Sequence, residues 1–163
     1  MTQSTDYQLL ARQLDALLEG ETDLIANLSN TSALLNENLD QINWVGFYLM
    51  KEGALILGPF QGKTACVHIQ VGQGVCGTAV QEGKTQRVED VHAFPGHIAC
   101  DANSQSEIVI PLHKNGEVVG VLDIDAPIQN RFSADDEAGL ENIVHVLESH
   151  LSLIHISEPT RPL

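Results

Sequence analysis

The sequence predicts an α+β fold in which a central antiparallel sheet of about six strands is covered by helices from both ends of the chain. Three observations predict it: helical periodicity near both termini, short β-branched segments punctuated by glycine between them, and a length of 163 residues. That length suits one domain with a hydrophobic core and is too short for two. Helices that flank a run of strands are typical of an antiparallel sheet covered by helices.

The N-terminal part of the chain is expected to form two helices. Between residues 5 and 18, leucines recur at helical spacing after the capping residues Ser4, Thr5 and Asp6. A second helix is expected from Thr22 to about Leu35, ending in the region of Asn36 and Asn38.

The middle of the chain is expected to form the sheet. Its segments are rich in β-branched and aromatic residues, and they span residues 42–50, 54–60, 65–71, 85–91, 107–112 and 117–125. Between the third and fourth segments, the small residues of 72–84 predict a short helix that carries Cys76. Asn115 and Gly116 predict a tight turn, so the last two strands should form a hairpin.

The last helix is expected after residue 131, with Ser133 as its N-cap, acidic residues in its first turn and an apolar stripe that ends at Leu151. Residues 152–163 contain two prolines, lack this periodicity and resemble translated cloning-adaptor sequence. We therefore expect one domain over residues 1–151 and leave the tail, 152–163, out of the functional argument.

The acidic balance of the chain argues against partners with anionic surfaces. Lysine and arginine total 8 against 22 aspartates and glutamates, which gives a net charge of −14 at pH 7. Such a chain repels a phosphate backbone or an anionic membrane, so neither nucleic acid nor membrane is expected as a partner. The start of the chain lacks a signal-peptide pattern, and no apolar run approaches the roughly 18 residues of a membrane span, which predicts a cytoplasmic protein.

Three cysteines, Cys66, Cys76 and Cys100, are candidates for reactive thiols. Their odd number and the absence of C-x-x-C spacing argue against a secreted disulfide framework and against a four-thiolate zinc site. Cys100 is expected on a loop among carboxylates, which raise the pKa of a thiol. An arriving ammonium group, a helix N-terminus or His97 would have to compensate. The alternative is that Cys100 is a buried, inert thiol.

Two carboxylates occupy the last strand where apolar side chains are expected. Alternation places Val119, Val121, Asp123 and Asp125 on one face of that strand. Carboxylates held together in a partly dry pocket raise each other's pKa, so this pair is suited to share a proton or hold a cation. The alternative is a strand that leaves the core and enters an acidic loop.

The position of Glu107 relative to these acids depends on the hairpin turn. A two-residue turn would pair Ile108 with Asp123 and leave Glu107 on the opposite face. A three-residue bulged turn would instead place Glu107 across from Asp125. The sequence leaves both registers open.

Trp44, the only tryptophan, lies in the first expected strand close to Tyr48. Core packing is the simpler explanation for an indole in an apolar strand. The functional alternative is that its ring face seats a methyl group or a sulfonium-like carbon beside the carboxylates.

Six segments, taken in order, resemble one family. They are "NWVGFY", "LGPFQGKTACVHI", "GQGVCGTA", "HIACDANSQSEIVIPL", "GVLDIDAP" and "RFSADDE", and they extend over residues 43–137. Together they resemble the free methionine-(R)-sulfoxide reductase family, a catalytic branch of the GAF domains. The final "GVLDID" segment is generic to GAF domains, whereas the three cysteines in three separate segments make the resemblance specific.

The resemblance implies a role for each matching residue. Cys100 would be the nucleophile, Cys66 the resolving thiol and Cys76 an auxiliary thiol, although the sequence does not decide between Cys66 and Cys76 for resolution. Substrate binding would fall to Trp44, Tyr48, Glu107, Asp123 and Asp125. The substrate would be free methionine-R-sulfoxide, the reductant thioredoxin, and no cofactor or metal would be needed. Similar proteins are often dimeric, so a homodimer is a further expectation.

The chemistry of that reaction fits the residues. A thiolate attacks a sulfoxide sulfur poorly unless the departing oxygen is protonated, so the site needs an acid that keeps its proton near neutral pH. We expect Glu107 or Asp123 to protonate the oxygen and Asp125 to pair with the substrate ammonium. Attack would leave Cys100 as a sulfenic acid, which Cys66 would convert to a disulfide.

Two other classes of function compete with this prediction. A GAF-type sensor would use the acids to bind a small ligand, and its cysteines would be incidental. A metal-dependent hydrolase would use the D-x-D pair together with a histidine, and it would lose activity in a chelator.

Overall fold

The computed structural model describes residues 4–97 and 102–151 of the chain. Its helices are α1 (Tyr7–Leu18), α2 (Leu24–Asn38), α3 (Gly74–Glu82) and α4 (Ala134–Leu151), with a short 3-10 helix, η1, at Val91–Ala93. Its strands are β1 (Trp44–Lys51), β2 (Ala54–Gly62), β3 (His68–Gln70), β4 (Gln86–Val88), β5 (Ser106–Lys114) and β6 (Glu117–Ala126).

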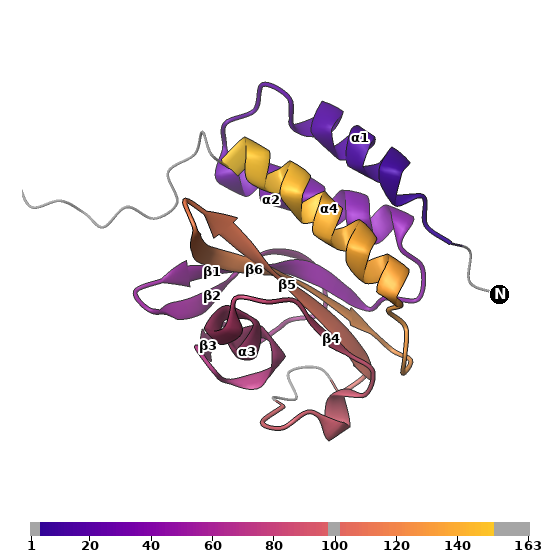
Figure 1. Ribbon diagram of the computed structural model, residues 1–163, viewed down its shortest axis with the longest axis vertical. Helices are drawn as coiled ribbons and strands as arrows, with labels where there is room; N and C mark the ends of the chain where they lie inside the picture. The colour runs from indigo at the N-terminus through magenta and orange to yellow at the C-terminus, as the bar shows by residue number, and fades with distance from the viewer. Residues whose placement is uncertain (1–3, 98–101, 152–163) are drawn as a thin grey trace, which may run out of the picture.

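The six strands form one antiparallel sheet in the order β3-β2-β1-β6-β5-β4. Helices α2 and α4 lie against one face of the sheet, α1 packs outside α4, and α3 lies on the opposite face (Figure 1). The α+β prediction is therefore confirmed, including the number of strands and the cover of helices from both ends of the chain. Among the described residues, no helix combines the length and apolar character needed to cross a membrane.

Aspartates determine where the first two helices begin. The side chain of Asp6 accepts a hydrogen bond from the Leu9 N–H (3.0 Å), and that of Asp23 accepts one from the Ala26 N–H (2.8 Å). These bonds satisfy backbone donors that have no partner within the helix. The first helix thus begins at the predicted capping cluster. The second begins two residues later than expected and ends at Asn38, within the region expected for its end.

The predicted cap of the last helix is confirmed. The Asp136 N–H donates to Ser133 Oγ (3.1 Å), and the Ser133 N–H donates back to Asp136 Oδ2 (2.9 Å). This reciprocal pair is a capping box, which starts α4 directly after Ser133.

The expected strands at 65–71 and 85–91 are longer than the observed strands β3 and β4. Cys66 consequently lies in the loop before β3, where its carbonyl accepts a hydrogen bond from Tyr48 Oη (3.0 Å). After β4, the Asp90 side chain accepts a hydrogen bond from the His92 N–H (3.0 Å) and starts η1. That side-chain cap ends the extended segment, and the sequence analysis did not identify it.

The β5–β6 hairpin decides the register that the sequence left open. Its turn has two residues, Asn115 and Gly116, with φ angles of 54° and 82° as a type I′ turn requires. A β-bulge beyond the turn then shifts the pairing, so that Glu107 lies across from Asp125. The observed hairpin therefore combines the turn length of one alternative with the pairing of the other.

The same bulge corrects one further expectation. Val119 was expected on the face of Asp123 and Asp125, but it packs against the opposite face of the sheet. Val118 pairs with His113 while Gly120 pairs with Leu112, so Val119 is the extra residue and the alternation is interrupted there.

Side chains of the sheet divide between two hydrophobic cores. The helix-side core fills the space between the sheet and helices α1, α2 and α4, and it includes Phe47, Ile108, Leu122, Ile124, Leu140 and Leu147. The α3-side core fills the space beneath α3 and consists of Trp44, Tyr48, Leu55, Ile69, Val75, Cys76, Ala79, Val109 and Val121. The acidic residues predicted for the site belong to the α3 side.

Candidate active site

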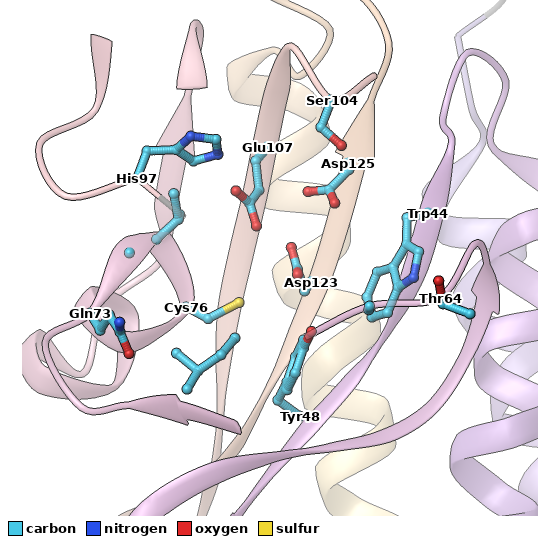
Figure 2. Close-up of a pocket in the computed structure, with 14 residues that line it drawn as sticks. Trp44, Tyr48, Thr64, Gln73, Cys76, His97, Ser104, Glu107, Asp123 and Asp125 are labelled. Atoms are coloured by element: carbon cyan, nitrogen blue, oxygen red, sulfur yellow. The ribbon is translucent and has the colours of Figure 1, made fainter. Parts of the chain in front are cut away.

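A pocket opens on the α3 side of the sheet, between α3, the ends of β1, β5 and β6, and two loops (Figure 2). It contains the predicted site residues Trp44, Tyr48, Cys76, Glu107, Asp123 and Asp125. Its other lining residues are Thr64, Ala65, Ile69, Gln73, Gly74, Val75, His97 and Ser104. Six of the eight site residues predicted from sequence therefore line one pocket.

Strand β1 contributes the aromatic wall of the pocket. Trp44 stacks against Phe60 with ring centroids 5.1 Å apart and against Tyr48 at 5.9 Å. Its Nε1–H donates to the Lys63 carbonyl (3.0 Å), so the ring contributes apolar surface to the pocket, not a hydrogen-bond donor. A side chain at Gly62 would meet Trp44 Cδ1 at 2.6 Å, so glycine is needed there for the indole to keep its position.

Three carboxylates gather where β5 and β6 run side by side, and Figure 2 shows them directed toward one another. Glu107 on β5 lies across from Asp125 on β6, and Asp123 is two residues further along the same face. Glu107 is 8% exposed and Asp123 is 5% exposed, whereas Asp125 is half-buried. The cluster is therefore largely removed from water.

Burial and crowding raise the pKa of these acids. Burial raises the pKa of Glu107 well above its ordinary value, and the charges of Asp123 and Asp125 add to this effect. Burial also raises the pKa of Asp123, although hydrogen bonds from Glu107, Cys76 and Asp125 counteract it. Hydrogen bonding thus favours the protonated form of Glu107 and the ionised form of Asp123. One proton shared between the two side chains relieves the repulsion of their charges.

A buried carboxylate oxygen of the cluster has no hydrogen-bond partner among the described residues. It is Asp123 Oδ1, which is buried in the pocket wall. A buried carboxylate oxygen without a donor is costly, so a ligand that brings a proton donor or a positive charge would be favoured there.

Cys76 lies in the first turn of α3 with its sulfur directed toward the acids (Figure 2). Its Sγ and one carboxylate oxygen each of Glu107 and Asp123 lie within 4.8 Å of one another. Burial raises the pKa of the Cys76 thiol well above its ordinary value, and the charges of Asp123, Glu107 and Asp125 raise it further. Cys76 is a free thiol, and these surroundings keep it protonated.

The other two cysteines differ from Cys76. Cys66 is half-buried in the loop before β3 and is disulfide-bonded. Cys100 lies outside the described residues, so its predicted role as nucleophile stays a prediction. The Tyr48 hydroxyl, which donates to the Cys66 carbonyl, links the aromatic wall to the Cys66 loop.

Sequence reasoning missed several residues of the pocket wall. Ser104 accepts a hydrogen bond from Asn43 Nδ2 (3.2 Å) and is buried at the edge of the acidic cluster. Gln73 lies directly before α3, in a segment for which the sequence predicted only a short helix and no further site residue besides Cys76. The sole signal was proximity in sequence, because Ser104 lies three residues before Glu107 and Gln73 lies three before Cys76.

His97 also lines the pocket, although the sequence offered it only as a means of compensating the charge around Cys100. Burial and the nearby His92 lower the pKa of His97. Since the lowered pKa favours the neutral imidazole, His97 does not provide a permanent positive charge at neutral pH.

Known proteins share this chain's fold and much of its sequence. The GAF domain family matches residues 21–152. The free methionine-R-sulfoxide reductase of Escherichia coli (strain K12) is 55% identical over 152 residues, which cover 93% of this chain and 92% of that relative. The chain belongs to the free methionine-R-sulfoxide reductase family.

Two solved structures agree with this assignment. The reduced form of fRMsr of Staphylococcus aureus has a TM-score of 0.90 and 61% identity, and it covers 93% of this chain and 98% of its own. The complex of that protein with its substrate has a TM-score of 0.89 and 60% identity, covering 93% of this chain and 99% of its own. The family resemblance inferred from the six sequence segments is therefore confirmed, and so is its placement within the GAF domains.

Proposed function

We propose that this chain reduces free L-methionine-(R)-sulfoxide to methionine by thiol chemistry. The observation that carries the proposal is the group of carboxylates, two buried and one half-buried, that shares a pocket with the Trp44 ring. The family supports the choice of substrate, because the Escherichia coli relative carries the reductase name and the Staphylococcus aureus protein was solved with its substrate.

Glu107 is the proton donor in this proposal. Burial and the charges of Asp123 and Asp125 raise its pKa well above the ordinary value, which favours the protonated form, and its hydrogen bond to Asp123 places that proton inside the pocket. Protonation of the sulfoxide oxygen makes the sulfur more electrophilic and lets the oxygen depart from it. We therefore assign the role of proton donor to Glu107, where the sequence had left Glu107 and Asp123 as alternatives.

The remaining acids recognise the amino group of the substrate. Asp125 pairs with the ammonium, and Asp123 Oδ1 offers a second acceptor within the same cluster. In a protein-bound methionine sulfoxide this amine is an amide, which leaves the carboxylate without its charged partner at a loss on the order of 2 to 5 kcal/mol. The pocket should therefore select the free amino acid, with the methyl end of the sulfoxide against Trp44.

Electrons come from cysteine thiols. The Cys100 thiolate attacks the substrate sulfur and forms an S–S bond, while the Glu107 proton goes to the oxygen and the S–O bond of the substrate breaks. The protonated oxygen then bonds to the Cys100 sulfur as the S–S bond breaks. The products are Cys100 sulfenic acid and methionine, so the substrate gains two electrons and the Cys100 sulfur loses two. The Cys66 thiol then displaces water from the sulfenic acid and forms a Cys66–Cys100 disulfide. The disulfide-bonded state of Cys66, together with the free, protonated state of Cys76, supports Cys66 as the resolving thiol.

Thioredoxin is the proposed reductant of this disulfide, which it returns to two thiols by a two-electron exchange. We propose the cytoplasm as the place of action, since a dithiol reductant maintains thiols there. The homodimer stays a prediction, and sedimentation velocity of the reduced protein at several concentrations tests it.

The direct test is an NADPH-consuming assay coupled through thioredoxin and its reductase. We expect turnover with free methionine-R-sulfoxide, little with the S epimer and little with a peptide that contains methionine sulfoxide. Absence of turnover with the free R epimer by the fully reduced protein would eliminate the enzyme and favour a ligand-binding sensor. Turnover that disappears in a chelator would instead favour the metal-dependent class.

A further inference from the structure

Three side chains that can bind a metal, one thiol and two carboxylates, meet in the wall of the pocket. The Sγ of Cys76 and one oxygen each of Glu107 and Asp123 lie within 4.8 Å of one another, and all three side chains are buried. Within residues 4–97 and 102–151, no other three histidine, cysteine, aspartate or glutamate side chains bring their ligand atoms this close. The arrangement brings a thiol to two carboxylates, so its donor set is mixed.

A second observation points to a positively charged ligand at this spot. Asp123 Oδ1 is buried, lines the pocket and has no hydrogen-bond partner among the described residues. Ammonium binding to Asp125 does not require Cys76, whose sulfur is directed at the same acids from α3 (Figure 2). The thiol and the open oxygen together suit a cation that accepts both sulfur and oxygen.

We propose that Cys76, Glu107 and Asp123 form a binding site for a zinc-type divalent cation, which occupies the pocket as an inhibitor. Zn²⁺ accepts thiolate and carboxylate ligands in tetrahedral geometry, and three protein ligands leave a fourth position toward the pocket. Mg²⁺ and Ca²⁺ prefer oxygen ligands alone, so the sulfur selects against them. On binding, the Cys76 thiol and Glu107 release their protons to solvent as the metal–ligand bonds form.

The inhibitory part of this inference rests on the proposed function. Glu107 and Asp123 cannot bind the cation and the substrate at the same time. In the proposed reaction Glu107 must donate a proton to the sulfoxide, and Asp123 must face the ammonium. Cation and methionine-R-sulfoxide should consequently exclude each other. The site itself requires no turnover, so cation binding is measurable even in a protein that proves inactive as a reductase.

Cobalt(II) is the probe for the test, because a thiolate ligand gives it a charge-transfer band in the near ultraviolet and four-coordination gives intense visible bands. The protein is the reduced full chain with the double substitution Cys66→Ser and Cys100→Ser, in which Cys76 is the only thiol. We expect the charge-transfer band to appear on titration with Co²⁺ and to disappear when Zn²⁺ displaces the cobalt. Circular dichroism of each variant verifies that it is folded.

To identify the ligands, one further substitution at a time is made in this double variant. Cys76→Ser should abolish the band, and Glu107→Gln or Asp123→Asn should each weaken Co²⁺ binding by about tenfold or more. The matched control is Glu117→Gln, an exposed glutamate on the same hairpin, which should leave binding unchanged. A folded double variant without the band would overturn the proposal, and so would a band that neither carboxylate substitution weakens.

Discussion

Two cross-strand pairs that are neighbours in the β5–β6 hairpin have opposite chemistry. Ile108 pairs with Ile124 on the helix side, and one residue away Glu107 pairs with Asp125 on the α3 side. The first pair is packed in a continuous apolar core, whereas the second is part of a charged and incompletely hydrogen-bonded cluster. Because one backbone ladder holds both pairs, the apolar face fixes the geometry of acids that on their own would repel each other.

This comparison separates stability from chemistry. Substitutions on the helix side should change the free energy of unfolding and leave the chemistry of the folded protein intact. Substitutions among the acids should change the chemistry without destabilising the fold, since each acid is itself costly to bury.

The largest effect is expected on the α3 side, from Glu107→Gln. The amide has nearly the same size but no acidic proton, so kcat should fall by about 10² to 10⁴ with little loss of stability. Steady-state kinetics with free methionine-R-sulfoxide and a urea titration measure the two quantities. Glu117→Gln is the matched control, because this exposed glutamate lies on the same hairpin. Near-normal kcat in Glu107→Gln would show that another group donates the proton.

The helix-side counterpart is Leu147→Ala. Leu147 is fully buried in α4 and packs in the helix-side core, so its truncation should lower the free energy of unfolding by about 2 to 5 kcal/mol. The folded fraction should keep its kcat and KM, which are measured under conditions where circular dichroism shows full folding. A large change in kcat at full folding would mean that the two faces are not independent.

The pH dependence of stability should differ in sign between the two regions. Burial, followed by the charges of Asp123 and Asp125, raises the pKa of Glu107 above its ordinary 4.5. The stability that protonated Glu107 contributes to the folded state is therefore fully present below pH 4.5. It is lost as pH rises from there through the pKa of the folded state, by up to about 1.4 kcal/mol per pH unit. The wild type should become less stable relative to Glu107→Gln as pH increases.

Asp136, at the start of α4, provides the opposite case. Burial raises its pKa, but hydrogen bonds from Ser133 and Tyr7 and the charge of Arg131 outweigh this and hold the pKa below the ordinary 3.8. The stability that ionised Asp136 contributes to the folded state is present above pH 3.8 and is lost as pH falls through the lower pKa of the folded state. The difference in the free energy of unfolding between the wild type and Asp136→Asn should thus become smaller in acid. Urea titrations from about pH 3 to about pH 9 measure both variants, and parallel curves would contradict the assignments.

The sequence predicted the four α-helices and the six strands, but not η1, the short lengths of β3 and β4 or every contact between the elements. Helix caps such as Ser133 and the turn at Asn115 have local signatures, so their positions were predicted. The bulge that moves Val119 and brings Glu107 across from Asp125 has no such signature, because it depends on which register buries both faces of the hairpin best.

The candidate site shows the same limit. Trp44, Asp123 and Asp125 were identified because their residue types are unusual for the strands that carry them. Ser104 and Gln73 are ordinary loop residues, and they reach the pocket only because the chain folds around β5 and α3. Tertiary proximity of this kind leaves no periodic pattern for sequence reasoning to use.

The smallest effect concerns the link between the aromatic wall and the Cys66 loop. Tyr48→Phe removes the hydrogen bond from Tyr48 Oη to the Cys66 carbonyl, a net contribution of about 0.5 to 1.5 kcal/mol. If Cys66 resolves the sulfenic acid, looser positioning of its loop should slow disulfide formation roughly two- to tenfold. Release of methionine precedes that step and should keep its rate.

Rapid-quench single-turnover experiments separate these two steps, with methionine measured by chromatography and free thiols by titration. Tyr7→Phe is the control, because it removes a comparable hydrogen bond, from Tyr7 Oη to Asp136 (2.6 Å), on the helix side. That variant should lose stability while both steps keep their rates. Slower methionine release in Tyr48→Phe would place the hydroxyl in substrate binding, and the link from the aromatic wall to the resolving thiol would then have no kinetic role.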